Sequence, residues 1–111
     1  MLRRLVLTAL LSLPFAGAAM AQCDTRIQLV NQSGHTIAQF FFSASSEGAW
    51  GEDRLGDEVL ANGETKIFDT GAPGAHDFRV VLDGGNNADV RNINICAASA
   101  IVATPTGIVA R

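Results

Sequence analysis

Short apolar runs alternate with clusters of turn-forming residues throughout the chain beyond residue 22. No stretch repeats apolar side chains at the three- and four-residue spacing of a helix. The clearest run is Asp77–Leu82, in which Phe78, Val80 and Leu82 occupy every second position. Because successive side chains of a strand point to opposite faces, this spacing predicts a half-buried strand. The pattern as a whole predicts an all-β fold.

Seven such runs are predicted strands, and their close spacing favours a small single-domain antiparallel β-sandwich. They cover residues 26–30, 36–43, 58–61, 64–68, 77–82, 89–95 and 99–103. The third and fourth runs are separated by Asn62-Gly63, a pair that favours a type I′ hairpin turn. The last predicted strand ends at Thr104–Gly107, which contains proline and glycine.

The run 36–43 is apolar on both faces, since Phe40 and Phe42 share one face and Ile37 and Phe41 share the other. Such a pattern fits a central strand, or a bulge that turns Ile37 toward the core. Three adjacent phenylalanines also leave open whether one ring lies on the surface.

The first 21 residues have the features of a secretory signal peptide. Arg3 and Arg4 precede an apolar run at 5–13, and Ala19-Met20-Ala21 fits a cleavage site. The apolar run is too short to span a bilayer comfortably, so no stable membrane anchor is expected after cleavage. The sequence therefore predicts a signal peptide at 1–21 and one domain at 22–111, in the periplasm or secreted.

Two cysteines, Cys23 and Cys96, lie in the predicted mature domain. Exported proteins mature in oxidising compartments, and two cysteines allow one intramolecular pairing. A bridge between them closes a long loop and is expected to stabilise the domain by roughly 4 kcal/mol. One structural disulfide is therefore predicted.

The predicted mature domain is acidic. Without Arg3 and Arg4 it carries six basic and eleven acidic side chains, a net charge of −5. Such a surface repels phosphate backbones, so nucleic-acid binding is not expected.

The segment 45–57, termed the tryptophan loop, is long for a connection in a small domain. It contains the only tryptophan of the chain, Trp50. A lone tryptophan in a small β-domain typically closes one end of the core. We accordingly expect a buried Trp50, turns at the glycines and hydrogen bonds from backbone N–H groups to Asp53. The alternative is a loop that binds a partner through Trp50, Gly51, Glu52, Asp53, Leu55 and Gly56.

Several short motifs resemble a group of small exported bacterial proteins that carry signal peptides and have no established activity. The motifs are Asn31-x-Ser33-Gly34-x-x-Ile37, Trp50-Gly51-x-Asp53-x-Leu55-Gly56, Leu60-x-x-Gly63, Asp77-Phe78-Arg79-Val80 and Cys96. The tryptophan motif is the most specific of them. The resemblance implies a small β-domain marked by the tryptophan loop, and it implies no reaction.

The sequence contains no G-x-S-x-G, H-E-x-x-H or P-loop motif. Only His35 and His76 offer an imidazole, both are expected in exposed turns, and neither belongs to a nucleophile motif. No enzymatic activity and no cofactor are therefore predicted. Acidic loops in exported β-domains often bind calcium, which makes Asp53, Asp57, Asp83 and Asp89 weak candidate ligands.

The expected function is a non-enzymatic binding or structural module of the bacterial periplasm, with an envelope protein or a small ligand as partner. One alternative is a secreted hydrolase inhibitor in which exposed Glu52 and Asp53 mimic an anionic group. A second is a calcium-binding β-domain. An enzyme that uses His76 with Asp77, or His35, is the least favoured hypothesis.

Overall fold

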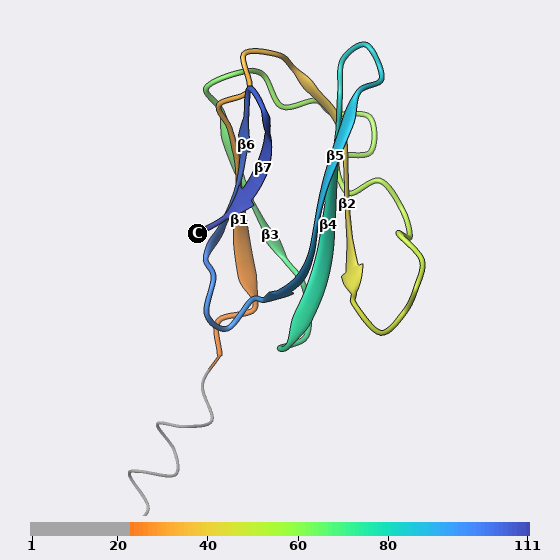
Figure 1. Ribbon diagram of the computed structural model, residues 1–111, viewed down its shortest axis with the longest axis vertical. Helices are drawn as coiled ribbons and strands as arrows, with labels where there is room; N and C mark the ends of the chain where they lie inside the picture. Colours follow the sequence, from red (N-terminus) through yellow and green to blue (C-terminus); the bar gives the residue numbers. More distant parts are fainter. Residues whose placement is uncertain (1–22) are drawn as a thin grey trace, which may run out of the picture.

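The computed structural model describes residues 23–111, which form two facing β-sheets (Figure 1). The predicted signal peptide at 1–21 lies outside the described residues. The elements, in chain order, are β1 (Arg26–Asn31), β2 (Ile37–Ala44), β3 (Thr65–Asp69), β4 (Ala75–Leu82), β5 (Asn87–Asn94), β6 (Ala100–Thr104) and β7 (Gly107–Ala110).

One sheet has the strand order β3-β1-β6-β7, and the other has the order β2-β4-β5. Neighbouring strands are antiparallel except β1 and β6, which run parallel. The two layers confirm the predicted sandwich of seven strands, and the parallel pair is the one departure from an all-antiparallel arrangement. No helix that could cross a membrane is found within residues 23–111.

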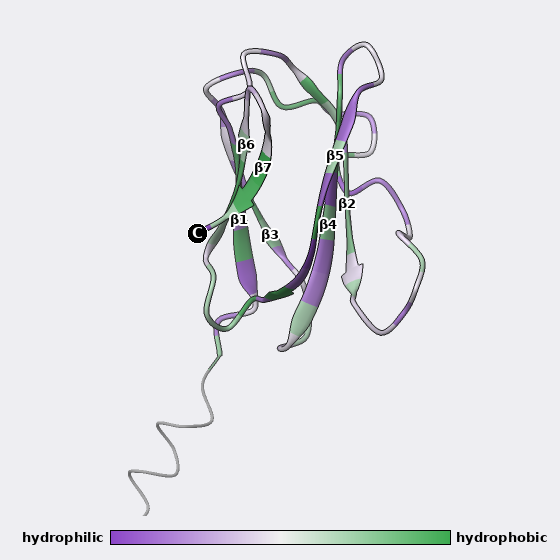
Figure 2. Ribbon diagram, viewed as in Figure 1, coloured by the Kyte–Doolittle hydropathy of each residue, from purple (hydrophilic) through white to green (hydrophobic). Residues whose placement is uncertain are grey.

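Phenylalanine rings fill the space between the sheets, where Figure 2 shows apolar segments on both layers. Phe40 is fully buried, and its ring centroid lies 5.0 Å from that of Phe68 in the opposite sheet. Phe78 stacks on Phe40 at 6.1 Å. Aromatic pairs at these separations stabilise a core beyond their buried area.

The predicted disulfide between Cys23 and Cys96 is present, with Cα atoms 5.1 Å apart. Cys23 precedes β1 in one sheet, and Cys96 follows β5 in the other. The bond therefore joins the two layers covalently at one end of the sandwich.

One strand prediction was wrong, and one strand was not predicted. Residues 58–61 form no strand, because only Leu60 pairs with β2, through a single bridge to Ile37. The turn at Asn62-Gly63 is not type I′ either, since Gly63 alone has a positive φ, of 91°. β7 was not predicted; it folds back on β6 after a tight turn at Pro105-Thr106. The Thr104 hydroxyl donates to the Gly107 carbonyl (2.9 Å) and fixes that turn.

β2 is an edge strand rather than a central one. Its register shifts between Ile37 and Gln39, and Ile37 is fully buried, so the alternative of a bulge is confirmed. Phe41 is the phenylalanine that stays half-buried, opposite Arg79 on the outer face of the sheet.

Loss of the disulfide should weaken this small domain severely. We expect the paired substitution Cys23→Ser and Cys96→Ser to lower the free energy of unfolding by about 4 kcal/mol, since the bond closes a long loop in the unfolded chain. Urea titration followed by far-ultraviolet circular dichroism measures the change. An unchanged midpoint, or free thiols in the untreated protein, would contradict the bond's role.

Candidate functional site

The tryptophan loop follows the free edge of β2, on the outside of the three-stranded sheet (Figure 1). The Phe40 N–H donates to Oδ1 of Asp53 (3.0 Å), and the Phe40 carbonyl accepts from the N–H of Arg54 (2.6 Å). The Leu55 N–H donates to the same carboxylate oxygen (3.0 Å). The prediction that Asp53 accepts backbone N–H groups is therefore confirmed.

Other parts of the loop satisfy the remaining edge of β2. The Arg54 guanidinium donates to the Phe42 carbonyl (3.0 Å) and lies 4.1 Å from the centre of the Phe42 ring. The Ala44 carbonyl accepts from the N–H of Glu47 (2.9 Å). Because an open strand edge is a site for unwanted pairing, the loop has a protective role.

Leu55, not Trp50, is the loop residue that enters the core. Leu55 is 4% exposed and belongs to the core cluster, whereas Trp50 is only half-buried and lies outside that cluster. The prediction of a buried Trp50 was wrong, because Leu55 of the same loop takes the place in the core and the indole packs on two arginines instead. Gly51 and Gly56 have φ values of 74° and 61°, which confirms their expected place in turns.

Trp50 packs against two arginines on the outer face of the three-stranded sheet. The Arg79 guanidinium on β4 lies 4.6 Å from the ring centroid, and that of Arg91 on β5 lies 4.8 Å away. Contacts of this kind stabilise an exposed site by about 0.5–1 kcal/mol each. The loop is held further by the Ser43 hydroxyl, which donates to the Ala49 carbonyl (2.6 Å).

Each arginine is paired with a carboxylate. Arg79 donates two hydrogen bonds to Asp89, at 2.6 and 2.8 Å, and these bonds hold the pKa of Asp89 below its ordinary value. Arg91 donates to Asp77 at 3.1 Å. We term the group of Trp50, Arg79, Arg91, Asp77 and Asp89 the Trp50 cluster.

Asp77 also fixes a bulge in β5. Its Oδ1 accepts from the N–H of Asn92 (2.9 Å) and the hydroxyl of Ser45 (2.7 Å). The Asn92 N–H is the main cause that lowers the pKa of Asp77, and Ser45 and Arg91 add to it. Asn92 adopts a positive φ of 58°, which asparagine tolerates better than most residues. The bulge places Arg91 beside Trp50.

The guanidinium of Arg91 is the accessible charge of the cluster. Its side chain is 55% exposed, against 29% for Arg79, 27% for Asp89 and 11% for Asp77. Arg91 makes one hydrogen bond within the described chain, at Nη1, and lies 3.8 Å from Asp89 through Nη2. A guanidinium has five N–H donors, so Arg91 keeps donors for a ligand.

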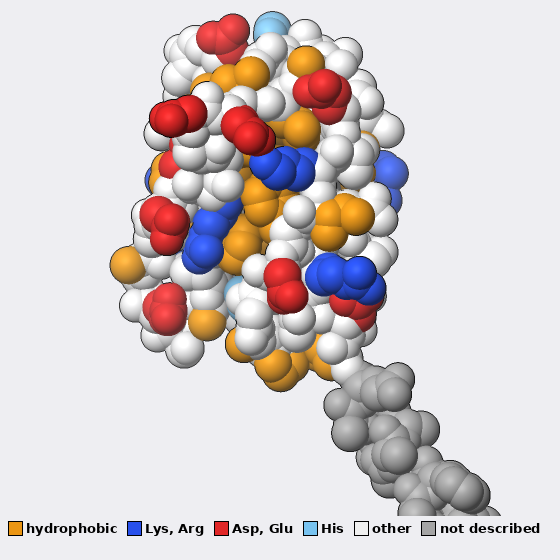
Figure 3. Space-filling view, turned by 180° about the vertical axis from the view of Figure 1, so that it is seen from behind, with side chains coloured by type: hydrophobic (Ala, Val, Ile, Leu, Met, Phe, Trp, Pro, Cys, Tyr) orange, Lys and Arg blue, Asp and Glu red, His pale blue; other side chains and the backbone are white. Residues whose placement is uncertain are grey.

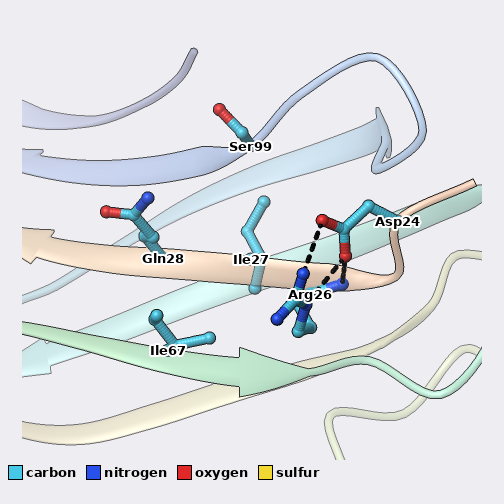
Figure 4. A pocket seen from close by; sticks show the side chains of 6 residues that line it. All are labelled: Asp24, Arg26, Ile27, Gln28, Ile67 and Ser99. Atoms are coloured by element: carbon cyan, nitrogen blue, oxygen red, sulfur yellow. Dashed lines mark hydrogen bonds and ion pairs between the residues drawn. The ribbon is translucent and has the colours of Figure 1, made fainter.

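Hollows on the described surface are small. The one beside Trp50 has a volume of about 60 Å³ and is lined by Ser43, Gly48, Ala49, Trp50, Asp77 and Arg91. A second, of about 170 Å³, lies on the outer face of the other sheet between Gln28 of β1 and Ile67 of β3 (Figure 4). A third, of about 180 Å³, lies at one end of the sandwich between Leu82 and Thr104.

The four candidate calcium ligands do not come together. Asp53 accepts backbone N–H groups and Asp89 pairs with Arg79, while Asp57 and Asp83 are exposed in separate turns. In the part of the chain that the structure describes, no three acidic, histidine or cysteine side chains are placed to hold a metal ion.

Of the two acidic residues that were expected to be exposed, Glu52 and Asp53, only Glu52 is exposed. Asp53 is partly buried against Phe40 and is not free to mimic an anionic group.

His76 was wrongly expected in an exposed turn. It lies on β4, is 3% exposed, and its Nδ1 lies 3.2 Å from the Gly74 carbonyl. Its neighbour Asp77 points to the opposite face of the strand, so the two side chains form no catalytic pair. His35 is exposed in a turn, as predicted.

Asn31 is fully buried, and its role in connecting neighbouring turns through hydrogen bonds was not predicted. Its amide donates to the carbonyls of His35 (2.8 Å) and Leu60 (2.9 Å), and its Oδ1 accepts from Ser33. The repeated turn residues after Asn31 were the available signal. Arg79 and Arg91 were also missed as partners of Trp50. Arg79 stands at an outward position of a predicted strand, but alternation with Ile93 and Ile95 places Arg91 inward, and only the bulge at Asn92 turns it to the outer face.

The chain matches no protein-family model, no curated protein and no solved structure. The resemblance to small exported bacterial proteins therefore stays a prediction, and the function proposed below rests on the site itself.

Removal of the Asp53 carboxylate should detach the loop from β2. We expect Asp53→Ala to lower the free energy of unfolding by about 1–3 kcal/mol, because two buried N–H groups lose their acceptor. Asp53→Asn keeps one oxygen and should lose less. Urea titration followed by Trp50 fluorescence measures both, and Glu52→Ala, an exposed neighbour, should change little. Equal effects of the alanine variants at 52 and 53 would contradict this role.

Acid should weaken the domain through the two carboxylates of the Trp50 cluster. Because their folded pKa values are lowered, their stabilisation is complete above the unfolded value of about 3.9 and is lost as the pH falls through the folded values. We therefore expect stability to hold from pH 7 to about pH 5 and to decline below pH 4. The decline should be shallower in Asp89→Asn, measured by urea titration at each pH. If the free energy of unfolding of Asp89→Asn depends on pH as that of the natural protein does, Asp89 does not contribute to the acid sensitivity.

Proposed function

We propose that this protein is an exported, non-enzymatic binding module of the bacterial periplasm, and that it contacts a protein partner through the Trp50 cluster. The observation that carries the proposal is the half-buried indole beside a guanidinium that is 55% exposed. Tryptophan and arginine are the side chains most enriched among residues that dominate binding energy at protein interfaces.

A protein surface fits the site better than a small molecule does. Pockets for drug-sized ligands typically enclose about 300–1,000 Å³. The hollow beside Trp50 encloses about 60 Å³, and the two others described reach about 170 and 180 Å³. The partner expected from these groups offers an apolar side chain to the indole and a carboxylate or carbonyl oxygen to Arg91.

The cluster is also arranged to keep its shape before it binds. Trp50 rests on two strands, and both arginines are oriented by carboxylates that the same strands supply. Groups that are ordered in advance lose little conformational freedom on association. This rigidity supports a recognition role for the loop in addition to its protective one.

Export and the absence of catalysis rest on separate arguments. The signal peptide is a prediction from sequence, and the disulfide supports it because such bonds persist in oxidising compartments. The hypothesis of an enzyme that uses His76 with Asp77 loses its basis, because the imidazole is buried in the core and the carboxylate faces outward.

The proposal is tested by capture from envelope extract with the processed, disulfide-bonded protein, followed by measurement of the affinity for each retained protein. We expect Trp50→Ala and Arg91→Gln each to weaken the true partner about thirtyfold or more, the loss typical of dominant interface residues.

Val109→Ala is the matched control, since Val109 is a 42% exposed apolar residue on the other sheet. Circular dichroism must show that each variant is folded. If every retained protein binds the Trp50 and Arg91 variants as well as the natural protein, the proposal fails.

A further inference from the structure

β3 has an unpaired edge. Thr70 N–H donates to the Thr25 carbonyl and Asn31 N–H donates to the Glu64 carbonyl, so the even-numbered residues of this segment bond to β1. The backbone N–H and C=O groups of Thr65, Ile67 and Asp69 point away from β1. Within residues 23–111, no backbone hydrogen bond joins these three residues to another strand.

An apolar side chain stands at the middle of that edge. Ile67 is 60% exposed, which is more than any other large hydrophobic side chain in the described chain. It projects from the outer face of the sheet next to Gln28 of β1, beside the hollow of about 170 Å³ (Figure 4). Three residues with open backbone hydrogen-bonding groups, with the isoleucine at their centre, form a surface for strand pairing.

We propose that the edge of β3 pairs antiparallel with β3 of a second copy of this chain, about a two-fold axis at Ile67. This register places Ile67 opposite Ile67 of the second copy and Thr65 opposite Asp69. Thr65, Ile67 and Asp69 are the residues of β3 with outward N–H and C=O groups, so the facing pairs that these three residues form exchange hydrogen bonds. The two four-stranded sheets become one continuous sheet.

Charge selects this register over its neighbours. The strand carries one cation and one anion, Lys66 and Asp69. Pairing about Ile67 sets Lys66 opposite Phe68 of the second copy, whereas a shift about Lys66, or a parallel in-register pairing, sets like charges directly opposite each other. A shift about Phe68 sets Ile67 opposite Asp69 and leaves Thr65 unpaired.

Lys66 does not block the edge. Its Nζ is bonded to Oε1 of Glu58 (2.6 Å) and lies 5.7 Å from the Phe68 ring centroid. Figure 3, which views the molecule from behind, shows hydrophobic side chains down the middle of the view with basic and acidic side chains around them. A lysine side chain that is held by Glu58 and lies near the Phe68 ring leaves the backbone of β3 accessible.

The expected association is weak, because one five-residue edge buries less than the roughly 1,200–2,000 Å² of stable interfaces. β3 and the Trp50 cluster belong to different sheets, so pairing leaves the cluster open. A dimer then presents the Trp50 cluster twice, which strengthens attachment to a partner that is itself multivalent.

Sedimentation equilibrium of the processed protein should show a monomer–dimer equilibrium that depends on concentration. Ile67→Pro should abolish the dimer, because its N–H points outward and contributes nothing to the pairing with β1. Ile67→Lys, which sets two cations at the axis, is the second variant in case proline disturbs the fold. Far-ultraviolet dichroism checks both.

The register is tested by cysteine cross-linking under oxidation. Two Ile67→Cys chains bring their Cα atoms to about 5.5 Å, within the reach of a disulfide. Two Thr65→Cys chains are offset by four residues, about 13 Å, and should not cross-link. A protein that stays monomeric to about 1 mM, a dimer that survives both Ile67 variants, or equal cross-linking at 65 and 67 would each overturn the proposal.

Discussion

The edge of β2 is the constraint on which the candidate site depends. A strand this apolar, left open, is a template for aggregation, and the chain covers it with its own loop. One carboxylate, that of Asp53, receives N–H groups from both the strand and the loop and so fixes the distance between them. Asp53 and Leu55 anchor the second half of the loop at the edge of β2. The first half then lies on the outer side of the sheet, where Trp50 contacts the two arginines.

Trp50 is outside for a reason that the core explains. Three phenylalanines of β2 and β4, with Phe68 across from them, already fill the space between the sheets. An indole would overfill it, while Leu55 fits. The outer face compensates by supplying two guanidinium groups, each oriented by a carboxylate, so that the indole gains contacts without entering the core.

The sequence predicts the layers better than the site. Alternation in Asp77–Leu82 is a local pattern, and two cysteines allow only one intramolecular pairing. The strand and the disulfide predicted from them are both confirmed. Whether β2 is central or an edge depends on which strands pair, which alternation does not encode. In a loop with one tryptophan and one leucine, either side chain could enter the core. The sequence therefore could not show that Leu55, and not Trp50, is the buried one. The buried role of Asn31 was not predictable, because one of its hydrogen-bond partners lies 29 positions away in the sequence.

The four edge strands within residues 23–111 differ in how well they are protected from pairing with another chain. β2 is covered by the tryptophan loop, β5 is bent by the bulge at Asn92, and β7 is only four residues long. Each of these devices discourages pairing with another chain. β3 has none of them: it is uncovered, shows no register shift against β1, and exposes Ile67 at its centre. A chain that protects three edges and leaves the fourth open restricts the strand pairing we propose to one place, on the sheet that does not carry Trp50.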